Sequence, residues 1–278
     1  MIFDHYDSVR IVSLPSRKDR RRDMLRELQA IGQADNPKIQ FFDALQRRDA
    51  GLFRSAGSHG CFHSHLAILE EAAAAKQSVL ILQDDCEFLP SIHEDIALDG
   101  CDILYGGYLA SDPDDLHGSD IIGAHCMGFS ARAASQASTY LRKLLDPAFP
   151  PDGKAAAQPG FNPALRPPID GACVWFRRAH PELKTVFHLV ANQRSSRSDI
   201  TPLRFFDRIW GLRTLAAVAR AIKRRLPHSD AVRGANPSFV APPVRSGGTP
   251  LTASEADLPS RSAPPPQPSI GKSLAGGR

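Results

Sequence analysis

The sequence predicts an α/β fold with a mainly parallel central sheet flanked by helices. Apolar segments of strand length alternate with longer segments of helical spacing from the N-terminus onward, which is typical of parallel sheets. The clearest strand is Val79–Leu82, where four apolar residues follow one another as in a strand buried on both faces. With 278 residues, of which 42% are hydrophobic and 23% charged, the chain can form one large globular domain or two small ones.

The other elements are expected in order along the chain. Strands are predicted at Val9–Leu14, Lys38–Ala44, Cys101–Leu109, His125–Ser130 and Thr185–Val190. Helices are predicted from the basic stretch after Pro15 to a stop at Gly32, over His63–Lys76, over Ala131–Leu145, and as a short helix opening at His180-Pro181. Residues 146–168 contain seven prolines and predict a flexible loop that covers an active site.

Charge divides the chain into an acidic and a basic part. The net charge is +4, but residues 201–278 carry +8 and residues 1–200 carry −4. The five cysteines lack any C-x-x-C spacing, which favours reduced thiols in a cytoplasmic protein. The charged N-terminus does not resemble a signal peptide, and no run of about 18 apolar residues predicts a membrane span.

We therefore expect three segments. Residues 1–200 form the main domain, and residues 201–226 form a basic amphipathic helix that either contacts an anionic membrane or packs on the domain. Residues 227–278 are rich in Pro, Ser and Gly and predict a disordered tail. A nucleic-acid-binding role for the tail is a weak alternative, because Phe239 is the only aromatic residue in it that could stack on bases.

Two adjacent carboxylates, Asp84 and Asp85, follow the Val79 strand directly. At the carboxyl end of a parallel strand both can line one crevice, which is where open α/β sheets bind ligands. Their mutual repulsion requires a cation, and a hard divalent ion such as Mg²⁺ or Mn²⁺ prefers oxygen ligands of this kind. The alternative is a solvated acidic turn without a ligand.

A basic cluster lies where the first strand meets the first helix. Arg17, Arg20 and Arg21 are candidates for binding phosphate there, because a helix N-terminus and guanidinium groups both favour anions. The alternative is a basic helix face that is simply solvated.

The segment Gly60–Leu66 is rich in histidine. With His59, it offers Cys61, His63 and His65 as zinc ligands by residue type, but the spacing is poor for a zinc site. The favoured interpretation is the N-terminus of a helix, with Ser58 or Ser64 as the N-cap residue.

Four motifs in this order resemble glycosyltransferase family 25, the bacterial lipooligosaccharide and lipopolysaccharide galactosyltransferase-like group. They are IVSLPSRKDRRRDM near the N-terminus, Phe42-Asp43-Ala44, Gly60-Cys61-Phe62-His63-Ser64-His65-Leu66 and VLILQDDCEF, and the resemblance covers about residues 8–180. The resemblance implies a GT-A-type nucleotide-sugar-binding fold, a divalent metal and sugar transfer to an outer-membrane glycolipid or related glycan. Gln83 departs from the pattern, since the family usually has Glu there, and an amide contributes no charge.

Residue roles follow from the motifs and this resemblance. Asp84 and Asp85 are assigned to the metal, and the donor is assigned to the following residues: Arg17, Arg20, Arg21, Gln83, Asp84, Ser64 and His65. Inversion at the sugar requires a general base, for which Asp170 is the first candidate, with Asp120 and Asp199 in reserve. His180 and His188 are alternatives for a late metal ligand or a phosphate contact, or are ordinary structural residues.

The predicted function is that of a metal-dependent glycosyltransferase with Mn²⁺ or Mg²⁺ as cofactor. It would move a hexose, with galactose the first candidate, from a UDP-sugar to a lipopolysaccharide or other glycolipid or oligosaccharide acceptor. The predicted place is the cytoplasm, at the inner face of the bacterial inner membrane, with no nucleic-acid partner. The alternative is a degenerate member of the same fold that binds nucleotide-sugar or glycan without catalysis.

Overall fold

The structure is a computed structural model that describes residues 1–194. The predictions for residues 201–226 and 227–278, and the reserve base Asp199, lie outside these residues. Within residues 1–194 no helix is both long enough and apolar enough to cross a membrane.

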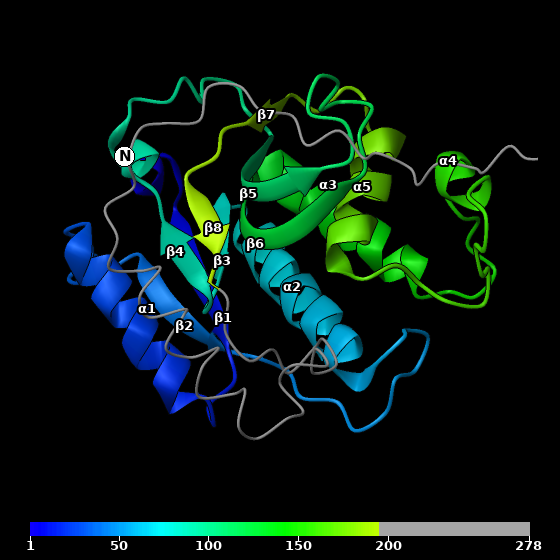
Figure 1. The fold of residues 1–278 in the computed structure, drawn as a ribbon, viewed down its shortest axis with the longest axis horizontal. Coiled ribbons are helices and arrows are strands. Elements are labelled where there is room, and N and C mark those ends of the chain that lie inside the picture. Colours follow the sequence, from blue (N-terminus) through cyan, green and yellow to red (C-terminus); the bar gives the residue numbers. More distant parts are fainter. Residues whose placement is uncertain (195–278) are drawn as a thin grey trace, which may run out of the picture. The chain divides into compact units, whose positions relative to one another are not determined.

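A six-stranded mixed sheet forms the centre of the described domain (Figure 1). Its order is β2-β1-β3-β6-β5-β7, and β6 runs against the direction that the other five strands share. The strands are β1 (Ser8–Ser13), β2 (Ile39–Asp43), β3 (Val79–Gln83), β5 (Ile103–Ala110), β6 (Ile121–Phe129) and β7 (Thr185–Phe187). A separate antiparallel pair joins β4 (Cys86–Phe88) to β8 (Ala191–Gln193). The predicted α/β class and mostly parallel sheet are confirmed.

Helices cover both faces of the sheet, with α1 on one side and α2, α3 and α5 on the other (Figure 1). Their bounds are α1 (Lys18–Ala30), α2 (Ala56–Ala75), α3 (Ala131–Leu144), α4 (Gly153–Ala156) and α5 (Ile169–Ala179), with short 3-10 helices at Ile2–His5 and Pro90–His93. Strand β3 contributes side chains to the hydrophobic cores on both faces of the sheet. Val79 and Ile81 pack in the core under α2, while Leu80 and Leu82 pack in the core under α1. Burial on both faces explains its unbroken apolar sequence.

Three helical boundaries differ from the prediction. Helix α2 begins at Ala56, seven residues before His63, because the Ser55 hydroxyl caps it by accepting a 3.1 Å hydrogen bond from the Ser58 amide. Ser58 and Ser64 are therefore not the cap. His180 ends α5 instead of opening a helix, and the proline-rich stretch after Asp146 contains the short helix α4, capped by Asp152.

The order of the strands creates a switch point between β1 and β3. The chain passes from β1 to β2 on one side and then returns to place β3 on the other side of β1, with all three strands parallel. The connections therefore diverge at the carboxyl ends of β1 and β3 and leave a crevice, which is the usual ligand position in such sheets.

Candidate functional site

A cavity of about 270 Å³ opens at this switch point. Residues at the carboxyl ends of β1, β2 and β3 line it together with the first turns of α1 and α2 and with β8. The predicted site residues among them are Arg17, Arg20, Gln83, Asp84 and Asp85. Five of the residues assigned from sequence thus lie around one hollow, as expected.

The aspartate pair is held by fixed donors at the floor of this cavity. The Ser13 hydroxyl donates to Asp84 Oδ2 at 2.7 Å, and Arg20 Nη1 donates to Asp84 Oδ1 at 2.9 Å. The same Arg20 nitrogen lies 3.5 Å from Asp85 Oδ2. Both aspartates are buried, so the solvated acidic turn considered for this segment is wrong. Arg20 supplies a positive charge that the pair requires.

Asp85 retains an open acceptor. Its Oδ2 accepts a 3.1 Å hydrogen bond from Gln193 Nε2, whereas its Oδ1 is buried and has no hydrogen-bond partner within the described chain. Burial raises the pKa of Asp85, against the lowering effects of Arg20 and Gln193. A buried carboxylate oxygen without a donor is costly unless a ligand completes it, so this atom points to a cation or a hydrogen-bond donor of a ligand.

Other residues of the cavity lining are suited to an anion. Arg17 precedes α1 and holds Asp19 through two hydrogen bonds of 3.0 and 2.9 Å, and Arg47 adds an exposed guanidinium from the segment after β2. The first turn of α2 contributes Ala56 and Gly57. Two helix N-termini and three arginines therefore surround the space next to the aspartates, an arrangement that favours phosphate oxygens.

Arg21 lies outside the cavity lining. Its guanidinium pairs with Asp43, donates to the Ser13 carbonyl at 3.0 Å and lies over the Phe41 ring at 5.1 Å. Arg21 thus ties α1 to the ends of β1 and β2, and its assignment to the donor is replaced by a role in positioning the arginine-bearing helix.

Ser64 is likewise a structural residue. It is fully buried, donates to the Gly60 carbonyl at 2.7 Å and accepts from the Leu45 amide at 2.8 Å. Gly60 allows this contact, because a Cβ there would lie 2.3 Å from the Leu45 carbonyl oxygen. The two residues hold the segment after β2 against α2 and so shape a wall of the cavity, which corrects the prediction that Ser64 contacts the donor.

His65 is also away from the cavity. It is buried, its Nδ1 lies 2.9 Å from the Cys61 carbonyl oxygen, and burial lowers its pKa, so the imidazole is neutral at pH 7. The Cys61 thiol does line the cavity, but burial raises its pKa to about 12, which makes it unsuited to be a nucleophile. Gln83 Nε2 lies 3.8 Å from this sulfur.

The histidines do not assemble a metal centre in the described part of the chain. No group of three or more His, Cys, Asp or Glu residues is arranged to hold a metal ion within residues 1–194. His180 pairs with Glu182 at 3.1 Å and His188 with Glu94 at 3.3 Å, and neither lines the cavity. The zinc alternative and the late histidine ligand therefore find no support in the geometry.

Asp170, the predicted base, lies in a second cavity instead of the first. Its Oδ2 accepts from the Gly123 amide at 3.1 Å, and the side chain lines a hollow beside α5. Helix α5, which carries Asp170, nevertheless packs against α2, which carries Cys61 of the first cavity. Burial raises the pKa of Cys61, and Asp170, Asp85 and Asp84 raise it further.

Four polar lining residues were missed from sequence: Ser13, Gln46, Arg47 and Gln193. Ser13 is the last residue of β1 and Arg47 follows β2, a local signal that could have been used. Gln193 reaches the site only because β8 pairs with β4, and its sequence surroundings give no indication of that pairing.

Comparisons with known proteins add little. No protein-family model matches the chain, and no curated protein matches it. Among solved structures, the chain is similar to the crystal structure of a glycosyltransferase involved in the glycosylation of the major capsid of PBCV-1. The TM-score is 0.40 at 10% sequence identity, over 68% of this chain and 94% of that chain. A similarity of this size supports no functional inference, so the function is inferred below from the site itself.

Proposed function

We propose that the protein is a glycosyltransferase that uses a nucleoside-diphosphate sugar as donor. The observation that carries the proposal is the cavity at the β1/β3 switch point, which two aspartates and three arginines line together: Asp84, Asp85, Arg17, Arg20 and Arg47. A diphosphate presents several anionic oxygens, which the arginines and the two helix N-termini can neutralise. The motifs that resemble glycosyltransferase family 25 agree with this proposal and imply a GT-A-type fold.

The leaving group of such a reaction is the nucleoside diphosphate, so the protein must stabilise the charge that develops on its oxygens. Arg20 is held by both aspartates, so its guanidinium charge lies at a fixed position in the cavity wall and needs little reorganisation during the reaction. Arg17 is oriented by Asp19 in the same way. These fixed donors are the part of the catalytic machinery that the chain itself supplies.

The residues present fit a divalent cation, Mn²⁺ or Mg²⁺, in a limited way. Asp85 would hold it through the unpartnered Oδ1, with Asp84 contributing charge from oxygens that already accept from Ser13 and Arg20. Mg²⁺ is usually held by one or two carboxylates together with substrate phosphates, so two aspartates suffice. When bound, such an ion acts as a Lewis acid on the diphosphate.

The finer predictions remain part of the proposal. The donor would be a UDP-hexose, with galactose the first candidate, and the acceptor a lipopolysaccharide or another glycan at the inner face of the inner membrane. Asp170 is proposed as the base for an inverting transfer, since it lines the second cavity from α5, a helix that packs against α2 of the first cavity.

Turnover of UDP-galactose, UDP-glucose and UDP-N-acetyl sugars, with and without Mn²⁺, tests the proposal. Asp85→Asn should reduce metal-dependent donor turnover by at least about a hundredfold, because it removes the charge beside the open oxygen. Asp35→Asn, an exposed aspartate in a turn remote from the cavity lining, is the matched control and should leave turnover unchanged. Equal turnover in both variants would contradict the proposed site.

A second candidate is a non-catalytic protein that binds a nucleotide-sugar or glycan. Gln83 lines the cavity where the family usually has Glu, and Arg20 already compensates the aspartate pair. Calorimetric titration of UDP-sugars with Mn²⁺ separates the two functions. Binding without turnover of any donor would favour the non-catalytic protein, whereas binding with turnover would favour the enzyme.

A further inference from the structure

The second cavity, of about 420 Å³, lies beside α5. The end of the β5–β6 hairpin, the proline-rich stretch after α4 and one side of α5 supply its walls. The lining residues that matter here are Asp120, Gln158, Phe161, Asn162, Asp170 and Trp175. A cavity of this size can enclose one or two sugar rings, and ligand sites usually combine apolar walls with a few fixed polar groups.

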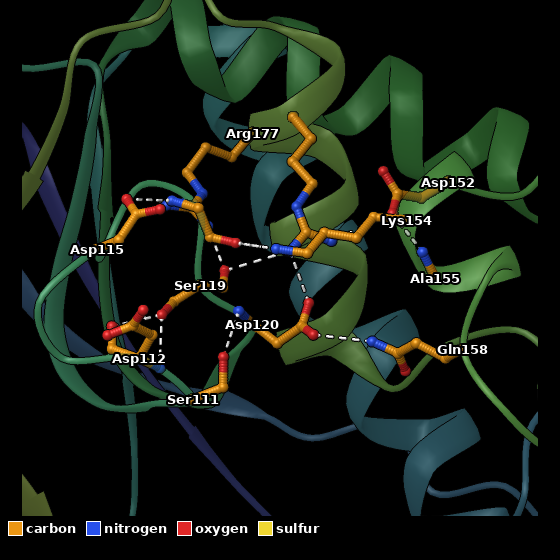
Figure 2. Close-up of polar contacts among 12 residues, drawn as sticks. Ser111, Asp112, Asp115, Ser119, Asp120, Asp152, Lys154, Ala155, Gln158 and Arg177 are labelled. Carbon is orange, nitrogen blue, oxygen red and sulfur yellow. Dashed lines mark hydrogen bonds and ion pairs between the residues drawn. The ribbon is translucent and has the colours of Figure 1, made fainter.

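Asp120 is the most firmly fixed polar group in this cavity. Its Oδ1 accepts from Arg178 at 2.7 Å. Its Oδ2 accepts from Gln158 at 2.9 Å (Figure 2). Arg178 also pairs with Asp152 at 3.1 Å, the residue that caps α4. The carboxylate is thus oriented before any ligand arrives, which reduces the entropy lost on binding.

A buried arginine holds the loop that carries Asp120. Arg177 donates to the carbonyl groups of Leu116 and Ser119, each at 2.9 Å, and Figure 2 shows it reaching from α5 toward that loop. Lys154 of α4 donates to the Gly118 carbonyl from the other side. Two elements therefore fix a loop that would otherwise be an exposed hairpin connection, and the result is a rigid rim on the cavity.

The chemistry of the walls favours a neutral polyhydroxyl ligand. Phe161 and Trp175 lie together, with ring centroids 6.4 Å apart, and supply apolar surface for the carbon face of a sugar ring. The exposed amides of Gln158 and Asn162 and the Asp120 carboxylate supply both donors and acceptors for hydroxyl groups.

The charged groups in the lining offset one another, with Arg54 and Arg166 against Asp120 and Asp170. The first cavity instead combines three arginines with two aspartates. The second cavity therefore lacks the excess of positive charge that an anion would need, and a neutral ligand suits it better.

We propose that the second cavity is a saccharide-binding site, with Asp120, Gln158 and Asn162 as its polar contacts and Trp175 and Phe161 as its apolar wall. Its further role, as the acceptor site of the transferase, rests on the proposed function. In that role Asp170, which lines the second cavity, would be the base for the acceptor hydroxyl, since its helix α5 packs against α2 of the first cavity.

The test uses tryptophan fluorescence of the full-length chain. The protein has two tryptophans, so Trp210→Phe leaves Trp175 as the single reporter in the cavity. The Trp210→Phe protein is applied to an array of defined bacterial-type oligosaccharides, and the strongest-bound oligosaccharide is then titrated free in solution. A saturable change in Trp175 emission is expected. Failure of every oligosaccharide on the array to bind would overturn the proposal.

Substitutions of lining residues test whether the oligosaccharide binds in the second cavity. Asn162→Ala and Gln158→Ala change exposed side chains. Each should lower the affinity for the titrated oligosaccharide by about fivefold to tenfold through the loss of one hydrogen bond. Asp114→Asn, an exposed residue of the β5–β6 loop outside the cavity lining, is the control and should leave affinity unchanged. Equal affinity in all three variants would place the saccharide elsewhere and overturn the site.

A parallel titration of the same proteins with UDP and Mn²⁺ separates this inference from the proposed function. UDP binding that is unchanged by Asn162→Ala and Gln158→Ala, together with weakened oligosaccharide binding, supports two distinct sites. Oligosaccharide binding without any UDP binding would keep the saccharide site but overturn its role as an acceptor site. UDP binding without any oligosaccharide binding would overturn the saccharide site while the transferase proposal stands.

Discussion

At the scale of single residues, Gly60 shows how closely the segment after β2 approaches α2. A methyl group on Gly60 would lie 2.3 Å from the Leu45 carbonyl oxygen, and backbone cannot move aside as a side chain can. Gly60→Ala should therefore lower the free energy of unfolding by about 1–3 kcal/mol, measured by urea titration. Gly153→Ala is the matched control, because its Cβ would meet nothing within 4 Å, and it should be neutral or slightly stabilising. A Gly60→Ala protein as stable as the Gly153→Ala protein would contradict this geometry.

Asp102 makes a pH-dependent contribution to stability. Burial acts to raise the pKa of Asp102, but hydrogen bonds from Arg132, Ser130 and the Lys184 amide outweigh it and hold the pKa below 3.8. Because the folded state favours the charged form, its stabilisation is present above pH 3.8 and is lost as the pH falls through the lowered pKa.

Asp102→Asn should therefore destabilise the protein by about 1.5–3 kcal/mol at pH 7, since charged hydrogen bonds are replaced by weaker ones. The difference in the free energy of unfolding between Asp102→Asn and the unmodified protein should shrink when urea titrations are repeated below pH 3.8. Asp99→Asn, an exposed neighbour, serves as control. A difference that stays constant down to pH 3 would show that the charge of Asp102 does not carry the effect.

At the scale of elements, the short pair β4–β8 brings the end of the described chain to the aspartates. Gln193 of β8 donates to Asp85 Oδ2 at 3.1 Å, and the Arg194 amide donates to the Asp85 carbonyl at 2.7 Å. Gln193→Ala should therefore weaken the binding of UDP with Mn²⁺ by about tenfold, because Asp85 loses a fixed partner and its orientation.

Asn192→Ala provides the comparison, because Asn192 lies on the same strand, pairs in register with Glu87 and is absent from the cavity lining. Both substitutions affect exposed side chains and should change the unfolding free energy by less than about 0.5 kcal/mol. Calorimetric titration of UDP with Mn²⁺ measures the affinities. Equal affinities in the two variants would mean that Gln193 does not orient Asp85.

Elements with a strong local signal could be predicted from sequence, and those set by distant partners could not. The apolar run of β3 and the periodicity of α1 gave bounds close to those in the structure. Helix α2 began earlier than predicted because its first turns contain two glycines, which hide the helical signal, while its cap lies upstream at Ser55. Strand β6 extends to Ile121 because its first residues pair with the end of β5.

At the scale of the whole molecule, part of the candidate site could be predicted from sequence and part could not. Asp84, Asp85, Arg17 and Arg20 could be predicted because each lies at a strand end or helix start, where the topology of an α/β sheet directs side chains to one edge. The second cavity could not be predicted, because Arg54 and the start of β6 meet the later stretch from α4 to α5 only in the folded chain and no motif marks them. The sequence therefore suggested Asp170 as a candidate base but did not predict that it lines a second cavity.

The distribution of charge over the whole chain leads to the last prediction. Residues 1–200 carry a net charge of −4 and residues 201–278 carry +8, so we expect attraction to an anionic surface to come from the second part. The full chain should bind vesicles of phosphatidylserine and phosphatidylcholine in low salt and be released near 1 M salt, where the Debye length falls to about 3 Å. A chain that ends at residue 200 should not sediment with these vesicles, and neither protein should sediment with pure phosphatidylcholine. Retained binding by the shortened chain would place the membrane contact in the described domain, and salt-resistant binding of the full chain would indicate insertion of apolar side chains instead of charge attraction.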